Sequence, residues 1–467
     1  MHMKKIVFQF SIICFLLGNT IASSAQNIDW FWNGYATLMG QDLRIVVQVE
    51  ETPDGLSAVM KSPDQGSGDL PVTAISLTGS QFSYSVESVG LTYEGVFDDG
   101  NQVITGNLNQ NGRLYPLTLV KEVLEKKEIA RPKNPSEPFN YTSEEISFKT
   151  LDGKYTLSGT LTIPAENITA VVVMVSGSGP QNRDSEILDH KPFWVWADHF
   201  AEKGIACLRY DERGVAASEG NFDMATSNDF AKDARAALNF LEKQSRFEAA
   251  AIGLVGHSEG GLVASLVGTM EEPVDFLVSL AGMGKDGRTL LEKQNFDIYV
   301  SSGLSAEMAR YETNKTMALI DLVIATPDSA EAYQAIRQQV ASWPEAETNS
   351  SVDKTTMAFN SSLNCVWMRN LLVLDPAPYW EKTTCPVLAI NGNNDLQVDA
   401  NANIRAIQFA LRRGGNTNGT FKIFPNMNHL FQETEDGSID LYGKLEQTVS
   451  PQVLEYVSDW IVTTSQK

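Results

Sequence analysis

The chain has 467 residues, which is too long for one ordinary hydrophobic core, so about two domains are expected. Apolar residues make up 43% of the sequence and charged residues 20%, a balance typical of globular proteins. The formal net charge of −22 predicts a surface that repels nucleic acid and anionic membranes, so neither is an expected partner.

The first residues have the pattern of a cleaved secretory signal, which we place at residues 1–25. Lys4 and Lys5 give a basic start, a short apolar stretch follows, and Ser23 and Ala25 place small residues at the −3 and −1 positions of a cleavage site. No later apolar segment is long enough to span a bilayer. We therefore expect an exported protein, periplasmic or secreted, without membrane insertion after cleavage.

Residues 27–122 have the pattern of a small all-β domain, either a barrel or a sandwich. Short alternating runs such as LRIVVQVE, QFSYSVE and LYPLTLV are separated by turn sequences such as TPDG and NQNG. This segment contains no histidine and no cysteine, so we expect it to support positioning or partner contacts and not the chemistry. A polar stretch at residues 123–143 is typical of a linker.

From residue 144 to residue 467 the pattern changes to that of an α/β domain. A hairpin is expected to turn at Asp152 and Gly153, and apolar strand segments then alternate with helical segments. One helix shows its apolar period at Phe230, Ala234, Ala237, Leu238 and Leu241. This alternation predicts a mostly parallel sheet covered by helices on both faces. Residues of about 285–384, between two strand segments, predict an inserted helical cap.

The segment AAAIGLVGHSEGGLVASLVG, residues 249–268, places a strand before a glycine-rich turn and a helix after it. Gly256 to Gly260 fits the G-x-S-x-G pattern, in which the serine occupies a strained turn and both glycines let neighbouring backbone pass close to it. We therefore predict that Ser258 is a nucleophile. The simpler alternative is a tight glycine turn between packed elements.

A serine hydroxyl needs a base within hydrogen-bond reach, and the base needs an acid that orients it. Four histidines follow the signal segment: His190, His199, His257 and His429. His190 and His199 precede the G-x-S-x-G segment in the chain. His257 lies on the strained turn, so its ring is expected to point away from Ser258. His429 follows the last strand segment, which gives the chain order serine, acid, histidine, and it is the predicted base.

The acid is expected after a strand that lies between the serine and the histidine in the chain. Asp395, in CPVLAINGNNDLQV, meets this condition and is the predicted acid. Asp375, in LDPAPYW, is the reserve candidate, but it precedes the strand segment.

Acyl transfer also needs N–H donors that are already in place for the oxyanion. The backbone N–H of Glu259, next to the nucleophile, is the first expected donor. The second is expected from SGSGPQNRD, with Ser178 as first choice and Gly179 as second. The alternative for this segment is an ordinary glycine loop.

Six segments occur in one order over residues 145–467: SGSGPQNRD, RYDERGVAASEG, GHSEGG, LDPAPYW, CPVLAINGNNDLQV and NMNH. In these the chain resembles α/β-hydrolases of the dienelactone-hydrolase-like esterase group. The resemblance implies an eight-stranded α/β-hydrolase fold and carboxylesterase activity on a small-molecule ester. It also implies the roles of nucleophile, acid and base for Ser258, Asp395 and His429.

Two details of the resemblance concern single residues. Relatives often carry histidine before the Gly-Ser-Gly, where this chain has Ser176. Asp211 and Arg213 match a turn that is structural in the group, so neither is expected to be catalytic.

Other interpretations of the sequence compete with a serine esterase. Gly282, Gly284 and Gly287 satisfy the dinucleotide fingerprint G-x-G-x-x-G, but late in the chain and before the insertion, so no cofactor is expected. The cysteines after the signal have no metal-site spacing, so no metal is expected. A serine peptidase of the prolyl-oligopeptidase type would share the triad, but residues 27–122 show no repeat that could build a propeller. A non-catalytic ligand-binding protein is the remaining alternative.

The inserted segment is expected to roof the acyl pocket. A roofed pocket favours short acyl groups, of roughly two to six carbons, and excludes long chains and folded proteins. The apolar and aromatic residues that could form the roof include Met308, Tyr311, Met317, Trp367, Met368 and Trp380. The alternative, equally open at this point, is that these side chains only pack the cap onto the sheet.

Overall fold

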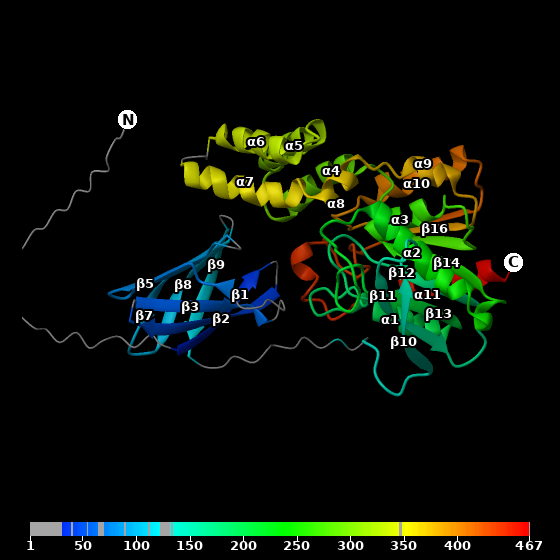
Figure 1. Ribbon diagram of the computed structural model, residues 1–467, viewed down its shortest axis with the longest axis horizontal. Coiled ribbons are helices and arrows are strands. Elements are labelled where there is room, and N and C mark those ends of the chain that lie inside the picture. The colour runs from blue at the N-terminus through cyan, green and yellow to red at the C-terminus, as the bar shows by residue number, and fades with distance from the viewer. Residues whose placement is uncertain are drawn as a thin grey trace, which may run out of the picture. The chain divides into compact units, whose positions relative to one another are not determined.

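The computed structural model describes residues 30–466, except for 39–40, 54, 64–69, 88–89, 111–112, 122–130, 132–133 and 345–347. The predicted signal at residues 1–25 lies outside the described residues, as does a large part of the predicted linker. The described residues form two compact units that divide near residue 125 (Figure 1). None of the helices described is both long and apolar enough to cross a bilayer.

The N-terminal unit is a nine-stranded antiparallel sheet in the order β4-β3-β2-β1-β9-β8-β7-β6-β5. Its strands are β1 (Trp30–Leu38), β2 (Gln41–Thr52), β3 (Gly55–Lys61), β4 (Leu70–Pro71), β5 (Ala74–Thr78), β6 (Gln81–Val86), β7 (Leu91–Asp98), β8 (Val103–Gln110) and β9 (Arg113–Val120). Strand β3, near one end of this order, also contacts β5 at the other end, so the sheet curls on itself. The predicted barrel or sandwich is thus one curled sheet, a half-barrel.

The core of this unit lies on one face of the curled sheet, because side chains of a strand alternate between its two faces. In β7, for example, Leu91, Tyr93 and Phe97 are buried while Glu94 and Val96 are exposed. Other buried members of the same core are Trp32, Val47, Val49, Phe82, Tyr84, Ile104, Leu108 and Leu119.

The C-terminal unit is built on an eight-stranded sheet in the order β10-β11-β13-β12-β14-β15-β16-β17. Its strands are β10 (Tyr141–Lys149), β11 (Thr156–Pro164), β12 (Ala170–Val175), β13 (Ile205–Tyr210), β14 (Ala251–His257), β15 (Phe276–Leu280), β16 (Val387–Gly392) and β17 (Gly419–Phe424). The first three strands of the order pair antiparallel and the others pair parallel. This is the predicted α/β-hydrolase fold, although β10 begins slightly before residue 144.

Helices cover both faces of this sheet, as the alternation of segments predicted. Helices α1 (Pro192–Glu202) and α11 (Pro451–Ser465) pack on one face, and α2 (Ser227–Glu242), α3 (Glu259–Val267) and α10 (Ala400–Arg413) pack on the other. The five residues that gave the period of α2 are all buried. Short 3-10 turns, η3 (Ser245–Phe247) and η4 (Ile439–Leu441), lie in the connections.

Among the described residues between β15 and β16, six helices follow one another. They are α4 (Gly287–Ser301), α5 (Ala306–Ala325), α6 (Ser329–Ala341), α7 (Asn349–Leu363), α8 (Val366–Val373) and α9 (Ala377–Lys382), and α5, α6 and α7 lie side by side (Figure 1). We call α4 to α8 the cap. Met368 and Leu371 of α8 share a hydrophobic cluster with Leu262 of α3, so the cap packs directly on the helix that follows Ser258.

The structure corrects part of the expected roof. Met308 and Tyr311 are 49% and 44% exposed, so they do not line an enclosed pocket. Trp380 is fully buried, but in the core that α9 shares with α3 and α10. Met317 and Met368 belong to the cluster that packs the cap on α3, the helix after Ser258, so for them the packing alternative holds.

Candidate active site

Ser258 stands between β14 and α3 with a φ of 56° and a ψ of −116°, a conformation that residues other than glycine rarely adopt. The backbone passes close on both sides of it. A Cβ on Gly256 would lie 1.9 Å from the carbonyl oxygen of Gly260, and a Cβ on Gly260 would lie 2.2 Å from that of Val175. The turn therefore requires both glycines, and it holds a strained serine at the carboxyl end of β14.

Asp395 follows β16 and His429 follows β17, and the fold brings the two side chains together. His429 Nδ1 lies 2.8 Å from Asp395 Oδ2, and both residues are buried. Oδ1 of Asp395 accepts hydrogen bonds from the N–H groups of Gln397 at 2.8 Å and Val398 at 2.9 Å. Because a carboxylate only accepts, Nδ1 of His429 carries the proton, and its Nε2 lone pair is free to take another.

The Ser258 hydroxyl and His429 Nε2 make no hydrogen bond to any protein group that the structure describes. Hydrogen bonds between a nucleophile and its base are often formed only once a substrate is bound. The free hydroxyl and the free Nε2 lone pair are the two groups that acyl transfer requires.

His257 lies closer to the site than the sequence predicted. Its ring packs on that of His429, with centroids 4.7 Å apart, and its Nε2 lies 2.9 Å from the main-chain oxygen of His429. Desolvation by burial, with a smaller contribution from repulsion by the His429 ring when that ring is protonated, lowers the pKa of His257 to about 3, so the His257 ring is neutral and its Nε2–H donates to that carbonyl. His257 thus holds the loop that carries His429.

The other candidates do not contact this pair. His190 Nδ1 lies 2.8 Å from Thr448 Oγ1, and its Nε2 lies 2.9 Å from the Tyr442 carbonyl, so this ring binds the loop before α11. His199 lies on α1 beside acidic side chains. Asp375, the reserve acid, accepts a hydrogen bond from the backbone N–H of Ala377 at 2.9 Å at the start of α9.

The expected oxyanion donors flank Ser258. Within the described residues, the backbone N–H groups of Glu259, Ser178 and Gly179 donate to no protein acceptor, as the predicted role of oxyanion donor requires. Gly177 approaches Ser258 closely, because a Cβ built on Gly177 would lie 3.1 Å from Ser258 Cβ. The sequence alone did not single out Gly177.

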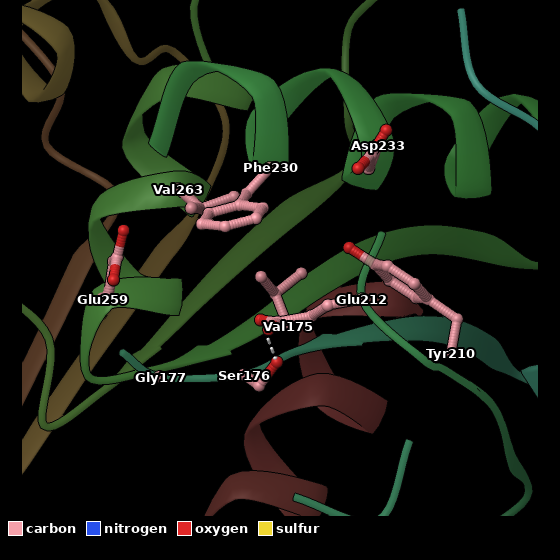
Figure 2. A pocket seen from close by; sticks show the side chains of 9 residues that line it. All are labelled: Val175, Ser176, Gly177, Tyr210, Glu212, Phe230, Asp233, Glu259 and Val263. Atoms are coloured by element: carbon pink, nitrogen blue, oxygen red, sulfur yellow. Dashed lines mark hydrogen bonds between the residues drawn. The ribbon is translucent and has the colours of Figure 1, made fainter. Parts of the chain in front are cut away.

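Two buried carboxyl groups, those of Glu212 and Glu259, lie beside the loop that holds Gly177 and Ser178. A role for neither side chain was predicted from the sequence. Ser176 Oγ donates to Glu212 at 2.7 Å. The N–H of Gln181 also donates to Glu212, at 2.9 Å. Figure 2 shows a small cavity with the Ser176–Glu212 hydrogen bond on one side of Gly177 and Glu259 on the other.

Burial dominates the electrostatics of both carboxyl groups. It raises the pKa of Glu212 to about 8, against the opposing hydrogen bonds from Ser176 and Gln181. It also raises the pKa of Glu259. Both groups therefore hold a proton more readily than an exposed glutamate does.

Asp211 and Arg213 have structural contacts. The Arg183 guanidinium lies 2.8 Å from Asp211, whose carboxylate also accepts from the backbone N–H of Arg183 at 2.8 Å. Arg213 binds the buried carboxylate of Asp233 at 2.6 Å and 2.7 Å. These pairs fix the loop after β12 and the turn after β13.

The described residues include no group of three or more histidine, cysteine or acidic side chains arranged to hold a metal ion. The three glycines of the late G-x-G-x-x-G sequence are closely packed: a Cβ would lie 2.1 Å from Ser279 Oγ at Gly282, and 2.3 Å from the Asn403 carbonyl at Gly284. Cys207, Cys365 and Cys385 are all free thiols.

Comparison with known proteins places the chain among hydrolases. The model of the family described as serine aminopeptidase, S33 (Hydrolase_4), matches residues 193–435. Esterase EstD of Thermotoga maritima is 23% identical over 328 residues, which cover 70% of this chain and 69% of EstD. The solved Pyrococcus furiosus esterase Pf2001 is 14% identical with a TM-score of 0.41, covering 70% of this chain and 91% of that one. Est1E of Butyrivibrio proteoclasticus, solved with ferulic acid, is 15% identical with a TM-score of 0.39, covering 69% and 100%.

Proposed function

The chain belongs to the serine aminopeptidase S33 family (Hydrolase_4), and we propose that it is a serine carboxylesterase that acts on short-chain acyl esters after export. One observation carries the proposal: a strained Ser258 with a free hydroxyl on the same sheet edge as an Asp395–His429 pair 2.8 Å apart. The relative EstD is named an esterase, which supports an ester as the substrate.

In acylation, the oxygen of Ser258 attacks the ester carbonyl carbon while His429 Nε2 takes the hydroxyl proton. Asp395 stabilises the imidazolium that forms. The carbonyl oxygen becomes an oxyanion and receives hydrogen bonds from the N–H of Glu259 and from the Ser178–Gly179 segment. The tetrahedral intermediate collapses, the bond to the alcohol oxygen breaks, and His429 returns its proton to that oxygen.

In deacylation, water replaces the alcohol. His429 takes a proton from the water as its oxygen attacks the acyl carbon of the Ser258 ester. The second intermediate releases the carboxylic acid, and the proton on His429 returns to the Ser258 oxygen, so the enzyme regains its starting state. Apart from the ester and the water, each step uses only Ser258, His429, Asp395 and backbone N–H groups of the chain.

Neither of the two buried acids, Glu212 and Glu259, is suited to bind the free amino terminus of a peptide. An aminopeptidase needs a carboxylate that can bind the α-ammonium group of its substrate. Glu212 and Glu259 lie beside the loop after β12. Both are buried and already accept hydrogen bonds from protein groups. Neither is available to an ammonium ion.

The position of the cap supports short acyl groups. Helix α8 packs on α3 through Met368 and Leu371, and Trp367 of α8 lies 3.0 Å from the carboxylate of Glu259, the residue next to Ser258. A cap seated this close leaves little room for a long acyl chain. A steric difference of about 1–3 kcal/mol is enough to lower kcat/KM for long chains more than tenfold.

The test is a panel of p-nitrophenyl esters from acetate to laurate, assayed beside aminoacyl anilides, with Ser258→Ala as the control. We expect the highest kcat/KM for short esters, negligible anilide cleavage, and a loss on the order of 10⁴-fold or more in folded Ser258→Ala. Faster anilide cleavage would favour the peptidase. A folded parent without turnover, and without labelling of Ser258 by a fluorophosphonate, would favour the non-catalytic ligand-binding protein.

Export is tested separately by expressing the full chain in a bacterial host and fractionating the cells. The basic start and the Ser23 to Ala25 exit predict a periplasmic or secreted product whose first residue is Gln26. Intact-mass measurement of that product checks the cleavage site. A full-length protein in the cytoplasmic fraction would contradict the expectation.

A further inference from the structure

The carboxylate of Glu259 has a set of contacts that the proposed reaction does not use. In that reaction only the backbone N–H of residue 259 takes part. The side chain is 2% exposed, and both its oxygens accept hydrogen bonds. Oε1 accepts from Ser227 Oγ at 2.7 Å, Oε2 accepts from Ser178 Oγ at 2.9 Å, and Trp367 Nε1 lies 3.0 Å from each oxygen.

These three donors come from three separate parts of the C-terminal unit. Ser178 lies in the loop after β12 that holds the expected second oxyanion donor, Ser227 is the first residue of α2, and Trp367 is on cap helix α8. We call residues 176–181 the oxyanion loop. The cap and the oxyanion loop are therefore both hydrogen-bonded to the Glu259 carboxylate. Glu259 itself is fixed because it begins α3 immediately after the strained Ser258.

The hydrogen bond from Ser178 to Glu259 positions the middle of the oxyanion loop. Glu212 holds its two ends, through Ser176 Oγ at 2.7 Å and the N–H of Gln181 at 2.9 Å. The side chain of Ser178, between these ends, has Glu259 as its hydrogen-bond partner. A small shift of the N–H donors at Ser178 and Gly179 weakens the stabilisation of an oxyanion, because this stabilisation requires donors that are already in place.

We infer that the Glu259 carboxylate is a positioning group that couples the cap to the oxyanion loop, so that Trp367 on α8 helps to set the place of Ser178 beside Ser258. The inference rests on the proposed function. It implies that the cap affects the chemical step as well as the size of the acyl pocket.

The test compares Trp367→Phe, which removes only the indole N–H donor, with Ser178→Ala, which keeps the backbone N–H and removes only the hydroxyl. Trp343→Phe is the matched control, because Trp343 lies in the same cap but packs on Phe359 and does not contact Glu259. The readouts are kcat and KM for p-nitrophenyl butyrate, the rate of Ser258 labelling by a fluorophosphonate, and the melting temperature.

We expect Trp367→Phe and Ser178→Ala each to lower kcat and the labelling rate about tenfold with little change in KM. The double variant should have about the same kcat as the more impaired of the two single variants, because both changes act through one carboxylate. Trp343→Phe should keep the parent's kcat. If Trp367→Phe does not fold, Glu259→Gln replaces it, since an amide has one acceptor oxygen in place of two.

A lower melting temperature with unchanged kcat and labelling in Trp367→Phe would overturn the inference and leave Glu259 a structural residue. Strictly multiplicative losses in the double variant would also overturn it. Failure of the proposed function looks different, because the parent itself would then show neither ester turnover nor labelling at Ser258.

Discussion

The Nε2 atom of His257 lies 2.9 Å from the main-chain oxygen of His429, and the two imidazole rings pack with their centroids 4.7 Å apart. The residue before the proposed nucleophile thus holds the backbone of the proposed base. Since His257 is next to Ser258 in the chain, the same contact ties the loop after β17 to the nucleophile turn.

We expect His257→Phe, which keeps an aromatic ring against His429 but loses the N–H donor, to lower kcat roughly tenfold, because the base is then less firmly placed. The pKa of His257 is lowered to about 3, so the acid limb of the pH–rate profile should persist in the variant. Steady-state kinetics across pH check both points. His199→Phe, on α1, is the control, and equal kcat in the two variants would contradict the role.

Asp395→Asn should lower kcat by on the order of 10⁴-fold, because an amide at this place no longer fixes the His429 tautomer that leaves Nε2 unprotonated. Asp375→Asn should retain nearly full activity, since Asp375 contacts the start of α9 and not His429. The measurement is kcat/KM on a short p-nitrophenyl ester for both variants. A severe loss in Asp375→Asn with an active Asp395→Asn would exchange their roles.

Glu212→Gln should change how stability depends on pH. Burial raises the pKa of Glu212 from an ordinary 4.5 to about 8, so the native state holds this proton where the unfolded chain has lost it. Stability from this group is fully present below pH 4.5 and falls as the pH rises towards 8. The effect at high pH is on the order of a few kcal/mol, and a glutamine, which has no such proton to lose, removes it.

Thermal unfolding at pH 5, 7 and 9 measures this difference. The melting temperature of Glu212→Gln should rise relative to the parent between pH 5 and pH 9. Glutamine can still accept from the N–H of Gln181 and donate to Ser176 Oγ, so the loop contacts remain possible. Parallel melting curves for the two proteins across this range would show that Glu212 does not carry the raised pKa.

Gly177→Ala should impair catalysis while the protein still folds. The added Cβ would lie 3.1 Å from Ser258 Cβ and 3.5 Å from the carbonyl oxygen of His257, so the nucleophile turn and the oxyanion loop must move apart by a few tenths of an ångström. We expect kcat to fall about tenfold or more. Gly100→Ala, whose Cβ would have only an ordinary 3.4 Å contact in a turn, is the control. Full activity in Gly177→Ala would mean that the loop tolerates the displacement.

The order of strands and helices in the C-terminal unit could be predicted from the sequence because each element carries its own pattern. The buried face of α2 is visible in its period, and the hairpin between β10 and β11 is marked by Asp152 and Gly153. The cap was also visible as a long helical insertion, but the exposure of Met308 and Tyr311 was not. An apolar side chain indicates that its face of a helix can be buried. Which faces are in fact buried depends on the neighbouring elements, and the sequence of the helix does not specify these.

The sequence by itself also determined the strained turn at Ser258, because the backbone requirement for Gly256 and Gly260 is local and leaves a short motif. It placed Asp395 and His429 as candidates by their order in the chain, and the tertiary structure brought them to 2.8 Å. Only the tertiary structure decided the partners of Glu259, Glu212 and His257. Trp367 and Glu259 are 108 residues apart in the chain, and His257 and His429 are 172 apart. A buried polar group must find a hydrogen-bond partner, but any of many distant donors can meet that need, and packing selects the one that the fold brings within reach.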